Sequence, residues 1–160
     1  MSSEPTGLAS HAYLDALKML ARRELSEAQV RQRLARRGHD EAAADAAIER
    51  LREERAIDDA RVAEAIARTE SASRRRGRLR AQRRIESAGI PAAVARRAVD
   101  DVYGSIDGDA LLEASLDRRL RGRETVADDR EMQRLYRYLV GQGFEPDKVM
   151  ALLRKRVRRR

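Results

Sequence analysis

Three segments of the chain align on a glycine, and this internal repeat restricts the fold more than any other feature of the sequence. The glycines are Gly38, Gly89 and Gly143, spaced by 51 and 54 residues. An aliphatic residue lies four positions before each glycine and another ten positions after it: Leu34, Ile85 and Leu139, then Ile48, Val99 and Leu153. A repeat of this length indicates tandem supersecondary units that stack on their nearest neighbours.

Each of these glycines is expected to close one helix just before another begins. Glycine enters the left-handed backbone region at little cost, which suits the position that follows a helix C-terminus. Two residues later stands Asp40, Pro91 or Glu145. Asp is a good N-cap and Pro is tolerated in a first helical turn, so a new helix is expected there. Each repeat therefore contains a helix, a glycine-centred turn and a second helix.

A further helix is expected ahead of each pair. In the first unit it covers His11 to Glu24, with an inward stripe formed by Tyr13, Leu14, Leu17 and Leu20. Ser26 and Gln29 then form a capping box for the next helix. Each later unit is also expected to use an aspartate as a helix start, at 58 or 59, at 107 or 109, and at 128 or 129. The apolar residues that follow recur at helical spacing.

The sequence thus predicts an all-α protein of three tandem three-helix repeats that form an elongated, curved array. No segment alternates over five residues in the way a half-buried strand would. Of the hydrophobic residues 27 are alanines, so the core should be thin and its helices close together. The expected organisation is a disordered N-terminus over 1–10, three repeats over 11–57, 58–106 and 107–155, and a basic tail over 156–160.

The positive charge of the chain is concentrated in its middle. Its net charge is +8, but residues 1–59 carry −2, residues 60–106 carry +6 and residues 107–160 carry +4. The segment from Arg68 to Arg84 alone holds eight arginines against the single acid Glu70. The basic residues are 32 arginines and only three lysines, and the planar guanidinium fork suits phosphate and carboxylate groups.

One helix of this segment presents its arginines away from the core. A helix starting at Gly77 places Ala81, Ile85 and Ala88 inward, and its other side carries Arg80, Arg83, Arg84 and Ser87, extended by Arg76. We interpret this side as a surface for an anionic partner, with a solvated charged face as the alternative. Nucleic acid phosphate and an acidic protein surface fit it equally well.

Other functions are disfavoured by what the composition lacks. The chain has no Cys, only two His and 3% aromatic residues, so neither a metal site nor a base-stacking platform is expected. No catalytic constellation stands out, and we expect no enzymatic activity and no cofactor. No apolar run approaches the ~20 residues that span a membrane, and the start lacks a basic region. We therefore expect a cytoplasmic, monomeric protein without a membrane partner.

Several short motifs, in order and at matching spacing, resemble the RecX regulatory family. They are Tyr13-Leu14 through Ser26 with Arg37-Gly38, then Asp58-Asp59-Ala60-Arg61-Val62-Ala63, Gly77-Arg78-Leu79-Arg80 with Gly89-Ile90, and finally Leu120-Arg121-Gly122-Arg123 with Gly143-Phe144. The resemblance covers roughly residues 12–155. The chain departs from the family pattern at four positions, where Gln29 replaces Glu, Val62 an aromatic residue, Arg78 a proline and Arg84 a glutamate.

The resemblance implies a modulator of the RecA recombinase. Such proteins lie in the helical groove of the RecA–DNA filament and lower strand exchange, ATP hydrolysis and co-protease activity. On this basis the expected partner is the RecA filament, with the DNA phosphate backbone as a further contact and a stand-alone DNA-binding protein as the alternative function. The residues expected to bind are Arg74, Arg75, Arg76, Arg78, Arg80, Arg83 and Arg84, supported by Arg61 and Arg68, with a second patch of Arg118, Arg119, Arg121 and Arg123.

Overall fold

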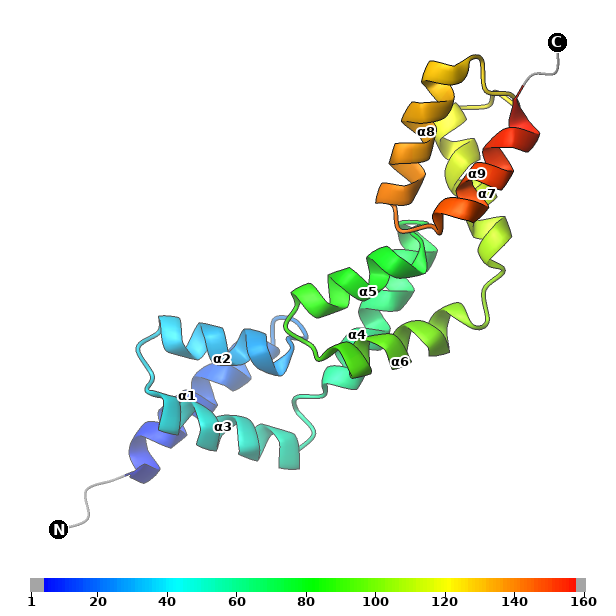
Figure 1. Cartoon of the computed structure of the whole chain (residues 1–160). Coiled ribbons are helices and arrows are strands. Elements are labelled where there is room, and N and C mark those ends of the chain that lie inside the picture. Colours follow the sequence, from blue (N-terminus) through cyan, green and yellow to red (C-terminus); the bar gives the residue numbers. More distant parts are fainter. Residues whose placement is uncertain (1–4, 158–160) are drawn as a thin grey trace.

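The computed structural model describes residues 5–157, and side chains from residue 7 onward. Within these residues the regular structure is helical, apart from an isolated bridge between Val126 and Val157. The α-helices are α1 (Pro5–Leu20), α2 (Glu27–Arg36), α3 (Glu41–Glu53), α4 (Asp59–Arg68), α5 (Arg78–Ser87), α6 (Ala92–Tyr103), α7 (Gly108–Leu120), α8 (Asp129–Gly141) and α9 (Pro146–Arg156). Figure 1 shows them as three successive groups of three helices in an extended array, as the repeat predicts.

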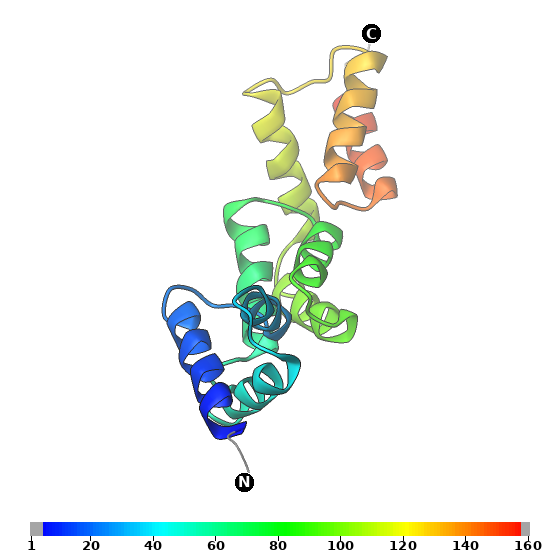
Figure 2. The ribbon, with the colours of Figure 1, turned by 90° about the vertical axis from the view of Figure 1, so that its left-hand side faces the viewer.

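Each group of three helices has an apolar core of its own. One cluster of buried residues extends from Ala12 to Ile57, a second from Val62 to Val99 and a third from Leu112 to Leu153. In Figure 2, seen from a second direction, the third group of helices stands well apart from the first. Alanines carry much of the first two clusters, and small side chains let helix axes approach closely. The thin core expected from the composition is therefore what the molecule has.

The repeated glycines end helices as the sequence predicts. Gly38, Gly89 and Gly143 have φ angles of +87°, +79° and +94°. At Gly143 the next residue, Phe144, donates its N–H to the carbonyl of Leu139, and the corresponding bond joins His39 to Leu34 in the first unit. These bonds satisfy carbonyls that a helix end leaves open. The capping box of Ser26 and Gln29 is present, and Asp107 and Asp128 cap α7 and α8.

The first helix differs from its prediction at both ends and on its buried side. It begins at Pro5, so residues 5–10 are helical and only 1–4 lie outside the described residues. It ends at Leu20, since the N-cap Ser26 requires an extended backbone for the entry into α2. Leu14 is 50% exposed, whereas Ala12 and Ala16 are fully buried. Close packing of α1 on α3 favours the alanine stripe of the helix over the leucine beside it.

Helix α4 continues beyond Arg68 into one further turn, so the loop that leads to α5 begins only at Arg74. Thr69–Ser73 forms a π-helical turn, in which the N–H of Arg74 reaches back five residues to the carbonyl of Thr69. The predicted basic tail also begins inside a helix, since Arg156 is the last residue of α9. Residues 158–160 of that tail lie outside the described residues.

Two junctions connect the three units through the ends of their second helices. Between units two and three, the C-terminal end of α8 meets the start of α5. The Gly77 N–H donates to the carbonyl of Gln142 at 2.9 Å, and the Leu79 N–H donates to the carbonyl of Gly143 at 3.2 Å. A Cβ on Gly77 would lie 2.3 Å from the oxygen of Gly143, so only glycine allows this approach.

Between units one and two, the end of α5 meets the start of α2. The Ser26 hydroxyl donates to the carbonyl of Ala88, which closes α5. The first N–H of α2, on Glu27, donates to Asp59 of α4 at 2.9 Å. Helices α8, α5 and α2 thus follow one another end to end along one side of the array, and we call them the helix line (Figure 1).

Candidate binding face

The arginine-rich segment from Arg68 to Arg84 folds around its single acid. Glu70 lies in the π-helical turn and is 1% exposed. Its two carboxylate oxygens accept hydrogen bonds from Arg74 and Arg76, each at 2.9 Å. The hydroxyl of Tyr103 donates to the carbonyl of Arg76 at 2.8 Å, and burial raises the pKa of that tyrosine. Arg74 and Arg76 therefore hold the loop in place, and their charge is partly neutralised.

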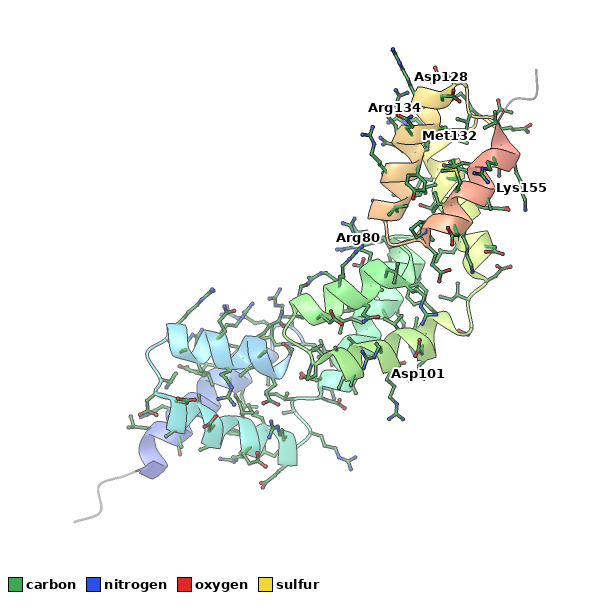
Figure 3. All side chains as sticks on the ribbon, in the orientation of Figure 1. Arg80, Asp101, Asp128, Met132, Arg134 and Lys155 are labelled. Carbon is green, nitrogen blue, oxygen red and sulfur yellow. The ribbon has the colours of Figure 1, made fainter. Side chains whose placement is uncertain are left out.

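Four other predicted arginines also have partners within the protein. Arg61 pairs with Glu24 of the first unit and Arg68 with Glu64 one turn back. Arg78 pairs with Asp100 of α6. Arg80 donates to the carbonyl of Gly141 at 3.0 Å, and Figure 3 shows it where α5 meets α8. These side chains stabilise the second unit and its junctions, although exposed ion pairs contribute only about 0–1 kcal/mol each.

Three predicted arginines have no acidic partner among the described residues. Arg75, Arg83 and Arg84 are exposed, and only Arg84 has a side-chain hydrogen bond, to the hydroxyl of Ser87 at 3.3 Å. Arg75 has a φ angle of +51°, which is unusual for a residue with a side chain. Of the segment's eight arginines, these are the ones whose charge is free for a partner.

Arg84 lies at the edge of a hollow between the first two units. The hollow has a volume of about 260 Å³, and its lining includes Arg23, Arg74 and Arg84 together with Glu24. Its apolar floor comes from α4 through Val62 and Ile66. The end-to-end meeting of α5 and α2 thus brings arginines from both units to one concave place.

The second predicted patch is divided among different environments. Arg123 pairs with Glu131, and this bond together with the N–H of Ala127 lowers the pKa of Glu131 to about 2. The guanidinium of Arg119 lies 4.8 Å from the centre of the Tyr138 ring. Arg121 follows α7 in a left-handed conformation. Arg118 and Arg121 have no acidic partner within the described chain.

The sequence interpretation missed arginines on the other two members of the helix line. Arg33 and Arg36 of α2 and Arg134 and Arg137 of α8 have no acidic partner among the residues described. The repeat itself could have revealed all of them except Arg36, because Arg33 and Arg84 stand five positions before their glycines, Arg83 and Arg137 six, and Arg80 and Arg134 nine. We define the basic face as Arg33, Arg36, Arg83, Arg84, Arg134 and Arg137.

Outside these basic residues the described chain offers little chemistry. It contains no group of three His, Asp or Glu side chains arranged to hold a metal ion. His39 is a structural residue, since its Nε2 lies 2.9 Å from Asp15 and this contact lowers the pKa of that carboxyl. Among the described helices, none is long and apolar enough to cross a membrane. The arginines without acidic partners are therefore the candidate binding groups of the described surface.

Comparisons with known proteins match this architecture along almost the whole chain. Residues 12–51 match the family model described as RecX, first three-helix domain. The chain is 36% identical over 147 residues to the regulatory protein RecX of Halorhodospira halophila, covering 91% of this chain and 88% of that protein. It is 34% identical over 134 residues to the regulatory protein RecX of Syntrophotalea carbinolica, covering 83% and 88%.

Two solved structures share the fold. The crystal structure of RecX from Lactobacillus salivarius superposes with a TM-score of 0.73 at 20% identity, covering 92% of this chain and 96% of that one. A second crystal structure, of a regulatory protein RecX, gives the same TM-score and identity and covers 92% of this chain and 72% of its own. At this identity the likeness concerns the arrangement of the helices.

Proposed function

This chain belongs to the RecX family of regulatory proteins, and we propose that it binds the RecA–DNA filament and inhibits the recombinase, ATPase and co-protease activities of RecA. Proteins of this family are regulators without enzymatic activity of their own. The proposed partner is the assembled filament, in the cytoplasm where the chromosome lies. Inhibition follows if the protein occupies the groove that strand exchange needs.

One observation carries the proposal. The helix line joins three units end to end, and unpaired arginines lie on each of its members. A rod with repeated cationic side chains on one side can meet successive acidic or phosphate groups of a periodic filament. Such complementary charges raise the rate and specificity of association more than its raw affinity.

The test is inhibition of RecA by a variant with two neutralised arginines. R83Q/R84Q removes two adjacent, exposed charges of the basic face, and we expect it to raise the concentration needed to inhibit the DNA-dependent ATPase of RecA at least about tenfold. The matched control is R96Q/R97Q, an adjacent and equally exposed pair on α6 of the same unit. This control should inhibit like the unaltered protein. If R83Q/R84Q inhibits RecA as well as the unaltered protein does, the basic face is not the surface that contacts the filament.

A stand-alone DNA-binding protein is the second candidate function. It is supported by Arg75, Arg83 and Arg84, which have no acid to pair with in the described part of the chain and present the fork that phosphate groups accept. It predicts binding to DNA without RecA, with an affinity that falls by about 0.9 logarithmic units per phosphate contact for each tenfold rise in salt. DNA binding by the protein alone, without any effect on RecA, favours this candidate over the first.

A further inference from the structure

The third unit carries a small hollow lined by arginines from two helices and the turn after the first. Its lining consists of Arg119, Arg121, Glu131, Arg134 and Leu135, and we call it the arginine hollow. Arg119 comes from the last turn of α7, Arg121 closes that helix, and Arg134 comes from α8, where Figure 3 labels it. Because all three arginines line one concavity of about 280 Å³, a single ligand can meet them together.

The only acid of the hollow is already occupied. Both carboxylate oxygens of Glu131 accept hydrogen bonds from Arg123, and one of them also accepts the N–H of Ala127 at 2.8 Å. Arg123 pairs directly with Glu131, and Arg134 also interacts with this carboxylate electrostatically. One acid therefore stands against Arg123 and the other three arginines, so the net charge at the hollow is positive. None of these three has an ion-pair partner within the described residues, and Arg119 instead lies against the ring of Tyr138.

The backbone at Arg121 adds an independent observation. Arg121 has φ +52° and ψ +48°, a left-handed conformation that glycine adopts more easily than any other residue. A glycine, Gly122, is the next residue and also has a positive φ. Strained residues with side chains are often found at functional sites. Here the strained residue is one whose side chain borders the arginine hollow.

We propose that the arginine hollow binds a phosphate group, held by the guanidinium groups of Arg119, Arg121 and Arg134. Arginine offers planar, paired N–H donors that match phosphate oxygens, and contact with the ring of Tyr138 orients the fork of Arg119. Pockets for drug-sized ligands have volumes of roughly 300–1,000 Å³. The hollow is slightly smaller and open, which suits one phosphate group. Free phosphate compounds and the phosphodiester of a nucleic acid strand share this chemistry.

This proposal does not rest on the regulation of RecA, and its test needs no RecA. Calorimetric titrations of the full chain with pyrophosphate, and separately with a single-stranded oligonucleotide of about 12 thymidines, measure the two sources of phosphate. We expect R134Q and R121G each to weaken binding at least about tenfold. R121G should leave the thermal midpoint unchanged or raised, because glycine suits that backbone. If R121G binds more weakly while its thermal midpoint is unchanged or raised, misfolding does not explain the weaker binding.

The matched control is R130Q. It removes one exposed positive charge next in sequence to Glu131 without changing the lining of the hollow, and we expect it to change binding less than about twofold. Binding of pyrophosphate supports a site for free phosphate compounds, and binding of the oligonucleotide alone supports the phosphodiester. The proposal is overturned if the unaltered protein binds neither ligand, or if R130Q weakens binding as much as R134Q does.

Discussion

The two junctions of the array join the same kinds of helix ends with different chemistry. Between units two and three, main-chain N–H groups at Gly77 and Leu79 donate directly to main-chain carbonyls at the end of α8. Between units one and two, side chains mediate the contact, through the Ser26 hydroxyl and the Asp59 carboxylate. Both junctions have a close approach at a glycine, Gly77 against Gly143 in one and Gly89 against Ala28 in the other. They differ in that two main-chain hydrogen bonds join the first, whereas side-chain hydrogen bonds join the second.

The largest effect is expected where a side chain is added to the first of these junctions. G77A places a methyl group against the main chain of Gly143, although the φ angle of −74° at residue 77 is acceptable for alanine. Main-chain atoms can shift less than the end of a flexible side chain to relieve such a clash. We therefore expect the free energy of unfolding of G77A to fall by about 3 kcal/mol. Urea titration followed by circular dichroism measures it. G141A is the control, since its Cβ would meet nothing within 4 Å; equal stability losses in both variants contradict the close-approach argument.

A smaller effect is expected from removing the serine of the other junction. Ser26 is fully buried, caps α2 and donates to Ala88 across the junction. S26A loses the cap and leaves the Ala88 carbonyl without this donor, so we expect a loss of about 2 kcal/mol in the same measurement. S87A is the control, because Ser87 is exposed and its hydroxyl donates only to Arg84 one turn back. If S26A loses less free energy of unfolding than S87A does, the junction between units one and two does not need Ser26.

The smallest effect concerns pH and Asp59. Burial raises the pKa of this carboxyl above its ordinary value of 3.8. A raised folded-state pKa means that the associated stability is present below the unfolded pKa and is lost as pH rises through the folded one. We therefore expect the unaltered protein to lose stability relative to D59N as the pH rises above the ordinary pKa of 3.8. Asparagine cannot titrate and keeps an oxygen for the Glu27 N–H, so it is the reference. A difference that does not change with pH, or changes in the opposite direction, contradicts the assignment.

Most of the fold could be predicted because its signals are local. The glycine of each turn, the caps at Ser26, Asp107 and Asp128, and the apolar period of each helix act within a few residues. The exposure of Leu14 could not be predicted in this way. The stripe that contains Leu14 and the stripe that contains Ala12 and Ala16 both fit the helical period. The alanine stripe is the buried one, because α1 packs closely on α3.

The free arginines were harder to identify than the basic segment that contains them. The π-helical turn shifts the register after Arg68 and turns Glu70 inward, where it pairs with Arg74 and Arg76. Other partners are distant in sequence, such as Asp100 for Arg78. Composition gives the sign of the surface charge, but the long-range contacts decide which charges are left for a ligand.

The helix line gives the molecule a direction. Its three helices follow one another head to tail, from the start of α8 to the end of α2, so the C-terminal end of one peptide dipole meets the N-terminal end of the next. Asp128, Asp129 and Glu131 stand at the positive end of this series, and Arg36 and Arg37 stand at the negative end. Turned end for end, the protein presents a different order of charges. For any partner built of repeating units that all point one way, the two orientations of the protein are therefore not equivalent.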